Sequence, residues 1–165
     1  WGIQPDRIGI LGFSAGGHLA CSSGVHFEPG DPNAADPIEK VSSRPDFMVL
    51  IYPVISMTEP YLHRGSRDNL LGKDAPEELA LYMSLEKQVT KDTPPTFLVA
   101  SWADTGVPCD NSIAFFLALK HADVPAELHV YEPGQHGFGM GKDPVTSTWP
   151  DLCLKWFQTR KITAK

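Results

Sequence analysis

Four short runs of apolar residues divide the chain, and segments with helical character separate them. Residues 47–52 and 96–100 are nearly continuous apolar runs, and residues 7–11 form a third. Such runs are typical of strands that are buried on both faces of a sheet. Residues 126–131 instead alternate between apolar and polar side chains, which indicates a strand exposed on one face. Helices are predicted at 15–25, 76–82, 109–121 and 150–160.

The alternation of these elements predicts the fold class. Strands that are separated by helices along the chain favour a parallel sheet with helices packed on it. We therefore expect an α/β protein with about four parallel strands and flanking helices.

Two long segments between the strands lack a regular pattern. Residues 27–46 contain four prolines, and residues 54–75 are irregular and polar. Because this region keeps aromatic and apolar residues, we expect functional loops rather than disordered linkers.

The composition fits one domain and argues against several classes of protein. The chain has 165 residues, of which 42% are hydrophobic and 21% charged, so we expect a single domain over residues 1–165. The formal net charge of −6 argues against a nucleic-acid-binding surface. No apolar run approaches the roughly 18 residues of a membrane-spanning helix, so no membrane partner is expected. The three cysteines lie far apart, which fits neither a disulfide framework nor a CxxC zinc site.

A G-x-S-x-G motif lies at residues 12–16, between the first predicted strand and the first predicted helix. In this setting the motif forms a tight turn that exposes a serine hydroxyl at the carboxyl end of the strand. Ser14 is therefore the candidate nucleophile, and the amide of Ala15 is a candidate oxyanion donor. We expect glycine at both flanking positions because side chains there would clash. The alternative is a structural turn with an inert serine.

A serine nucleophile needs a base, and His136 is the best placed of the six histidines. It follows the last predicted strand in a glycine-rich segment that can bring an imidazole over the edge of the sheet. The alternative is a histidine with a purely structural role in that loop. The other five lie in predicted helices, in a strand or in the irregular region: His18, His26, His63, His121 and His129.

The acid that orients the base is expected between the serine and the histidine in the chain. Asp104 directly follows the strand at 96–100, where catalytic groups of parallel sheets are found. Asp110 is a rival, although it fits a helix N-terminus better, and Glu132 is a weaker candidate.

A metal site deserves consideration because His18 and Cys21 are three residues apart on one predicted helix. No second group of ligands accompanies them, so the pair alone does not predict a metal centre. The sequence contains neither G-x-G-x-x-G nor a P-loop motif. We therefore expect no metal or organic cofactor.

Six segments of the chain carry a resemblance to a known family: residues 1–9, 12–20, 44–56, 63–67, 91–97 and 137–141. Together they resemble the α/β-hydrolase esterase/lipase family, and its acetylxylan-esterase-like branch in particular. The similarity covers almost the whole chain. The resemblance implies that Ser14, Asp104 and His136 are the nucleophile, acid and base, and that the Ala15 amide is one oxyanion donor.

Three positions depart from that family's pattern. Relatives usually have histidine where this chain has Ala100, an acidic residue at Ala103 and a larger residue at Gly106. None of these changes removes the expected acid, but together they can alter the rigidity of its loop.

The resemblance also implies an activity, a location and an extent. The implied enzyme is a serine carboxylesterase that removes acetyl or other short acyl groups from carbohydrate esters. The resemblance also implies a secreted or periplasmic location, although no signal-peptide pattern opens the chain. The implied fold is a partial α/β-hydrolase domain without its N-terminal strands or the loop that supplies a second oxyanion amide. The strand at 7–11 would then be an edge through which two copies could pair. The alternatives are a peptidase or amidase related to prolyl oligopeptidases, and an inactive remnant that acts as a binding module.

Overall fold

Four parallel strands form one sheet, and they lie in the same order in space as along the chain. The computed structural model describes residues 2–163. Each strand pairs in parallel with the next one, so that Phe13 lies opposite Ile51 and Ile51 opposite Val99. The strands are β1 (Gly9–Phe13), β2 (Phe47–Ile51), β3 (Thr96–Ser101) and β4 (Ala126–Tyr131).

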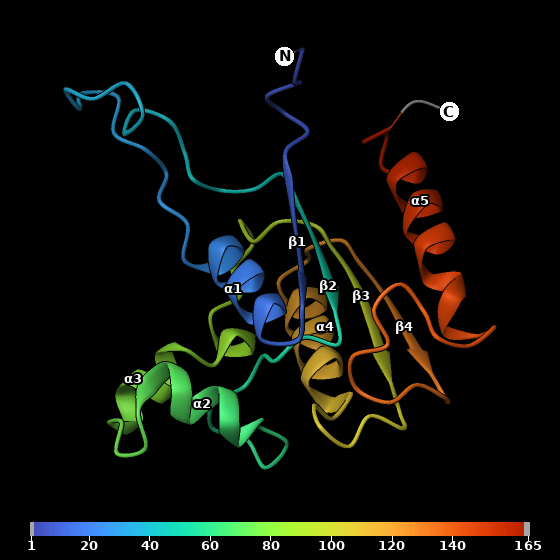
Figure 1. Cartoon of the computed structure of the whole chain (residues 1–165). Coiled ribbons are helices and arrows are strands. Elements are labelled where there is room, and N and C mark those ends of the chain that lie inside the picture. Colours follow the sequence, from blue (N-terminus) through green and yellow to red (C-terminus); the bar gives the residue numbers. More distant parts are fainter. Residues whose placement is uncertain (1, 164–165) are drawn as a thin grey trace.

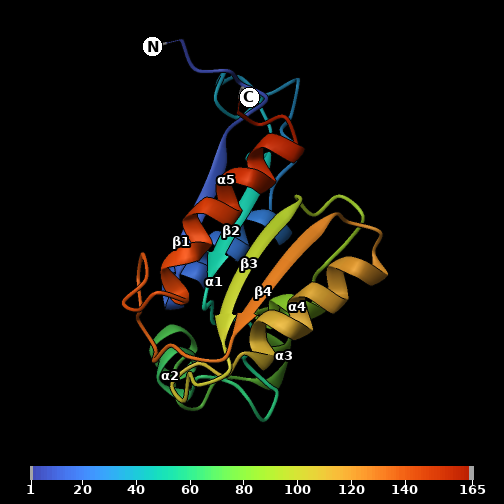
Figure 2. The ribbon, with the colours of Figure 1, turned by 90° about the vertical axis from the view of Figure 1, so that its right-hand side faces the viewer.

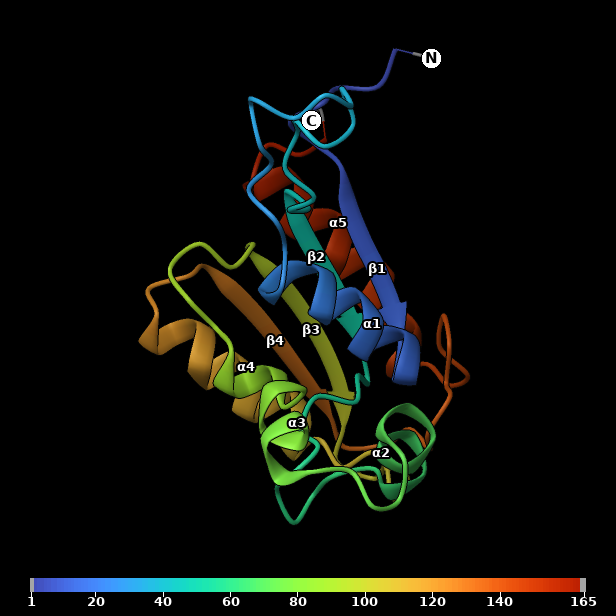
Figure 3. The same ribbon diagram turned by 90° about the vertical axis from the view of Figure 1, so that its left-hand side faces the viewer.

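Helices cover both faces of this sheet. On one face lie α1 (Ser14–Val25) and α4 (Asp110–His121), as Figure 3 shows, and on the other lies α5 (Trp149–Thr159), which is in front in Figure 2. Two short helices, α2 (Arg64–Leu71) and α3 (Glu77–Tyr82), lie near the carboxyl ends of the strands (Figure 1). No helix among residues 2–163 is long and apolar enough to cross a membrane.

The two central strands separate two apolar clusters, which explains their continuous hydrophobic pattern. Met48 and Leu50 of β2 face the cluster under α1 and α4, whereas Val49 and Ile51 face the cluster under α5. All four side chains are almost fully buried. A strand buried on both faces has no polar face to give it an alternating sequence. The α5-side cluster also contains Tyr52, Phe97, Val99, Phe138, Trp149, Cys153 and Trp156.

The first strand lies two residues later than the sequence pattern predicts, at Gly9–Phe13 rather than 7–11. Pairing begins where Gly9 meets Phe47. Just before that point Asp46 binds both backbone polar groups of Ile8. Its carboxylate accepts a hydrogen bond from the Ile8 amide at 2.8 Å, and its own amide donates one to the Ile8 carbonyl at 2.8 Å. The strand then continues into α1 with no intervening loop.

The region at 54–75, which was expected to be irregular, contains the helix α2. Its only large apolar residues, Leu70 and Leu71, are adjacent at its end, so they form no i, i+3, i+4 stripe for a periodicity argument to detect. His63 caps it, since Nδ1 accepts a hydrogen bond from the amide of Ser66 at 3.1 Å. Residues 27–46 run past the opposite end of the sheet, so the two irregular segments lie at different ends of the molecule (Figure 1).

Within the described residues, β1 pairs on one side only and forms one edge of the sheet. The side chains of Ile8 and Leu11 are about half exposed there, at 51% and 50%. An edge of this kind offers unpaired backbone groups and apolar side chains to another strand.

Candidate active site

Ser14 occupies the junction of β1 and α1 in a left-handed backbone conformation with φ of +54°. A Cβ atom at Gly12 would overlap the carbonyl group of Gly16, and one at Gly17 would lie 2.7 Å from Cβ of Pro53. At Gly16 itself an added Cβ would meet nothing within 4 Å. The expectation that both flanking glycines of the motif avoid a clash is therefore wrong for Gly16, and Gly17 is the second position that requires glycine.

The three residues expected to form the catalytic group lie in hydrogen-bond contact. Oγ of Ser14 is 2.7 Å from Nε2 of His136, and Nδ1 of His136 is 2.7 Å from Oδ2 of Asp104. They come from the ends of β1, β3 and β4, where the loops that follow these strands meet. The Asp104 side chain is 1% exposed and that of His136 is 31% exposed. The acid is therefore shielded from water, while the base is open to a reactant.

The backbone of the acid loop fixes the orientation of Asp104. Its Oδ1 accepts hydrogen bonds from the amides of Gly106 and Val107, both at 2.9 Å. This leaves Oδ2 to accept from Nδ1 of His136. With the ring proton on Nδ1, as we assign it from this network, Nε2 is free to accept the hydroxyl proton of Ser14.

The rival acids lie elsewhere. Asp110 is the first residue of α4 and is exposed, and Glu132 is exposed just after β4. The hydrogen bonds of the described residues join His136 to Asp104 and to neither rival.

His18 and Cys21 both point into the protein from α1 rather than forming a ligand pair. Nε2 of His18 lies 3.0 Å from the carbonyl oxygen of Met83, and burial lowers the pKa of this imidazole. Cys21 is fully buried, and burial raises the pKa of its thiol well above the usual range. Residues 2–163 contain no group of three His, Cys, Asp or Glu side chains arranged to hold a metal ion.

Ala15, the proposed oxyanion donor, lines a groove between α1 and α2. Its amide lies in the first turn of α1, where backbone N–H groups have no partner within the helix. The groove has a volume of about 470 Å³. Its lining is mainly apolar and includes Leu19, Met57, Leu70 and Met83.

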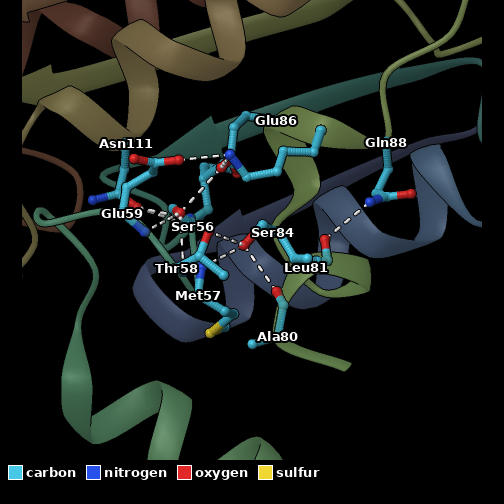
Figure 4. A network of polar contacts seen from close by, with 12 residues as sticks. Ser56, Met57, Thr58, Glu59, Ala80, Leu81, Ser84, Glu86, Gln88 and Asn111 are labelled. Carbon is cyan, nitrogen blue, oxygen red and sulfur yellow. Dashed lines mark hydrogen bonds and ion pairs between the residues drawn. The ribbon is translucent and has the colours of Figure 1, made fainter. Parts of the chain in front are cut away.

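A buried polar network joins Asn111 of α4 to the segment that follows β2 (Figure 4). Oδ1 of Asn111 accepts from the amides of Ile55 and Ser56, both at 3.0 Å, while its Nδ2 donates to the carbonyls of Tyr61 and Pro108. The same segment donates the Val54 amide to the carbonyl of Ser14 at 3.0 Å. Asn111 thus connects the surroundings of the serine to those of the acid, a role that the sequence analysis did not predict.

Two aromatic residues that the sequence analysis did not single out hold the loop of His136. The hydroxyl of Tyr52 accepts from the amide of Gly139 at 2.9 Å, and Nε1 of Trp149 donates to the carbonyl of Gly139 at 3.0 Å. Tyr52 directly follows β2 and Trp149 begins α5, and neither position carries a sequence signal for this role.

Comparison with known families shows to which of them the chain belongs. The BD-FAE family model matches residues 1–119. The chain belongs to the BD-FAE family.

Two curated relatives match most of this BD-FAE chain. Endo-1,4-beta-xylanase B of Butyrivibrio fibrisolvens is 39% identical over 152 residues, covering 90% of the chain and 23% of the relative. The acetylxylan esterase of Xylanibacter ruminicola is 34% identical over 145 residues, covering 86% of the chain and 28% of the relative.

A solved structure shares the fold of the BD-FAE chain closely. The acetyl ester-xyloside bifunctional hydrolase of Caldicellulosiruptor lactoaceticus superposes with a TM-score of 0.95 at 47% identity, over 98% of this chain and 60% of that one. The expected α/β-hydrolase fold is confirmed, with four parallel strands and flanking helices. The chain spans about a quarter of the length of the two curated relatives.

Proposed function

We propose that this BD-FAE chain carries the catalytic centre of a serine carboxylic ester hydrolase. The observation that carries the proposal is the unbroken hydrogen-bonded series from Ser14 through His136 to Asp104, with both contacts at 2.7 Å. A serine hydroxyl is a weak nucleophile unless a neighbouring base accepts its proton. This arrangement supplies that base, together with a buried carboxylate that orients it.

The proposed reaction has two acyl-transfer steps. Oγ of Ser14 attacks the ester carbonyl carbon while Nε2 of His136 takes the hydroxyl proton. The negative charge on the carbonyl oxygen is stabilised in part by the amide of Ala15, which the start of α1 leaves without a helical partner. The tetrahedral intermediate collapses as His136 gives its proton to the departing alcohol. Water then loses a proton to His136 and hydrolyses the acyl-enzyme, which restores Ser14.

Asp104 acts through His136 in both steps. Its carboxylate keeps the proton of the neutral imidazole on Nδ1 and stabilises the imidazolium that forms when Ser14 attacks. The residues named in these steps all belong to this chain.

For the substrate, we propose an acetyl or other short acyl ester of a carbohydrate. The names of an acetylxylan esterase and of an acetyl ester-xyloside hydrolase among the relatives support this class. An ester is also a suitable substrate chemically, because its alkoxide leaving group departs more readily than the amine of a peptide.

Covalent labelling tests the activated serine directly. A fluorophosphonate probe should label the wild-type chain and Ser23→Ala but not Ser14→Ala. Ser23 is a suitable control because it lies on the same helix and its hydroxyl donates only to the carbonyl of Leu19. Absence of labelling in the wild type would favour the inactive binding module.

A comparison of substrates tests the ester class. Hydrolysis rates would be measured for an aryl acetate, an acetylated xylo-oligosaccharide and a prolyl peptide amide, and faster cleavage of the amide would favour a peptidase.

A further inference from the structure

Tyr52 breaks the alternation of side chains along β2. Met48 and Leu50 face the α1 side of the sheet, and Val49 and Ile51 face the α5 side. Continued alternation would place Tyr52 on the α1 side. Instead its ring packs in the α5-side cluster, because its backbone adopts a left-handed conformation with φ of +39°. Such a conformation is rare for a bulky residue, and sparsely populated conformations tend to cluster at functional sites.

This unusual backbone lies beside that of the nucleophile. β1 and β2 pair so that Phe13 lies opposite Ile51, and the next residues along the two strands are Ser14 and Tyr52. Both have positive φ values, +54° and +39°. The residues that directly follow these two adjacent strands, Ser14 and Tyr52, therefore lie at the same level and both have left-handed backbones. Ser14 presents the candidate catalytic hydroxyl.

The side chain of Tyr52 reaches the loop that carries the base. Its hydroxyl oxygen accepts a hydrogen bond from the amide of Gly139 at 2.9 Å. Its ring lies edge-to-face against the imidazole of His136, with 5.1 Å between ring centroids and an interplanar angle of 68°. Burial raises the pKa of this hydroxyl, and the nearby charge of Asp104 adds to that effect against the Gly139 hydrogen bond. The phenol therefore stays neutral at physiological pH.

The loop of His136 depends on support of this kind. Gly134, Gly137, Gly139 and Gly141 all have positive φ values, between +58° and +123°. Glycine loses more conformational freedom on folding than other residues, so a loop rich in it does not hold one shape by itself. The peptide groups of Gly139 are held from two sides, the N–H by Tyr52 and the carbonyl by Trp149.

We propose that Tyr52 is a positioning residue for the base. Its hydroxyl fixes the loop at Gly139 and its ring borders the imidazole, so that Nε2 of His136 stays within hydrogen-bond reach of Ser14. This inference rests on the proposed esterase function, but its geometric part can be measured without catalysis.

The test compares Tyr52→Phe with Tyr131→Phe in the full chain. The first variant keeps the ring and removes the hydroxyl that accepts from Gly139. The second is a matched control, because the Tyr131 hydroxyl lies 2.9 Å from that of Thr148, and the hydrogen bonds of the described residues join it neither to Gly139 nor to His136. We expect Tyr52→Phe to lower kcat for an aryl acetate by about 5- to 20-fold with KM within about twofold, the size expected for one lost hydrogen bond. Tyr131→Phe should stay within about twofold of the wild type in both parameters.

Proton NMR gives a second readout that a purely structural role would not change. The proton between Nδ1 of His136 and Asp104 should give a downfield resonance, assignable by its loss in His136→Gln. This resonance should shift or broaden in Tyr52→Phe and remain in place in Tyr131→Phe. Trp149→Phe, which removes the donor to the Gly139 carbonyl, should alter it in the same way and serves if Tyr52→Phe proves poorly folded.

The possible outcomes separate the two proposals. Wild-type turnover and an unmoved resonance in both Tyr52→Phe and Trp149→Phe would overturn the positioning role while leaving the esterase proposal intact. A displaced resonance in a chain that hydrolyses no ester would support the positioning role and overturn the esterase proposal.

Discussion

The side chains of Asp104 and His136 meet at 2.7 Å although 32 residues separate them along the chain. The contact exists because β3 and β4 are parallel neighbours, so that the loops after both strands lie at the same end of the sheet. The first prediction follows from this contact.

Asp104→Asn should lower kcat for an aryl acetate by about 10³- to 10⁴-fold, because an amide there permits the wrong imidazole tautomer. Asp110→Asn should change it by less than about twofold, since Asp110 is exposed at the start of α4. Steady-state kinetics on both purified variants checks this. A larger loss in Asp110→Asn would show that the acid is misassigned.

The turn around Ser14 predicts opposite effects for two glycines of one motif. Gly12→Ala should destabilise the chain by about 1–3 kcal/mol, because its Cβ would overlap the Gly16 carbonyl. Gly16→Ala should raise stability by up to about 1 kcal/mol, since Gly16 lies in α1 and its Cβ would meet nothing within 4 Å. Urea unfolding of the two variants gives both values, and equal destabilisation would contradict this description of the turn.

His18 predicts a loss of stability in mild acid. Burial lowers its pKa below the usual 6.5, so the unfolded chain binds a proton at this residue more readily than the folded chain does. The contribution of His18 to stability is therefore complete above about pH 6.5 and is lost as the pH falls from there through the lower folded pKa.

Urea midpoints at pH 7.5 and pH 5.0 measure this effect. His18→Gln should show a smaller difference between the two values than the wild type does. His121→Gln, which changes an exposed histidine at the end of α4, should retain the wild-type difference. If the urea midpoints of His18→Gln differ between the two pH values as much as those of the wild type do, another group causes the pH dependence.

The free edge of β1 predicts self-association of this chain. Leu11 is 50% exposed, and among residues 2–163 the backbone of β1 pairs on one side only. Leu11→Lys should shift sedimentation toward the monomer, because a lysine on an edge strand opposes pairing with another strand. Leu154→Lys places the same charge on α5, at a residue that is 48% exposed, and should leave association unchanged. A monomeric wild type would rule out pairing through this edge.

The sequence predicted the parallel strands and their places along the chain well, because buried parallel strands leave continuous apolar runs such as residues 47–52 and 96–100. It also pointed to Ser14, Asp104 and His136, since each directly follows a strand or lies in a glycine-rich segment beyond one. The structure brings these three side chains together, and their catalytic roles remain predictions.

Other features leave no trace in the sequence pattern. The large apolar residues of the helix α2 are only Leu70 and Leu71, which are adjacent and therefore make no apolar period. The start of β1 depends on hydrogen bonds between Ile8 and Asp46, which are distant in the chain. A left-handed backbone at a tyrosine is contrary to residue preference, so the position of Tyr52 could not be inferred from its neighbours.

The glycine-rich loop that carries His136 has a consequence for behaviour on heating. Each glycine gains more freedom on release than another residue would, so the free energy needed to detach the loop falls steeply as temperature rises. The sheet, by contrast, is held by two apolar clusters, to which the loop contributes only Phe138. We therefore expect turnover to fail at a lower temperature than that at which the chain unfolds, and cooling from the interval between these temperatures to restore it fully.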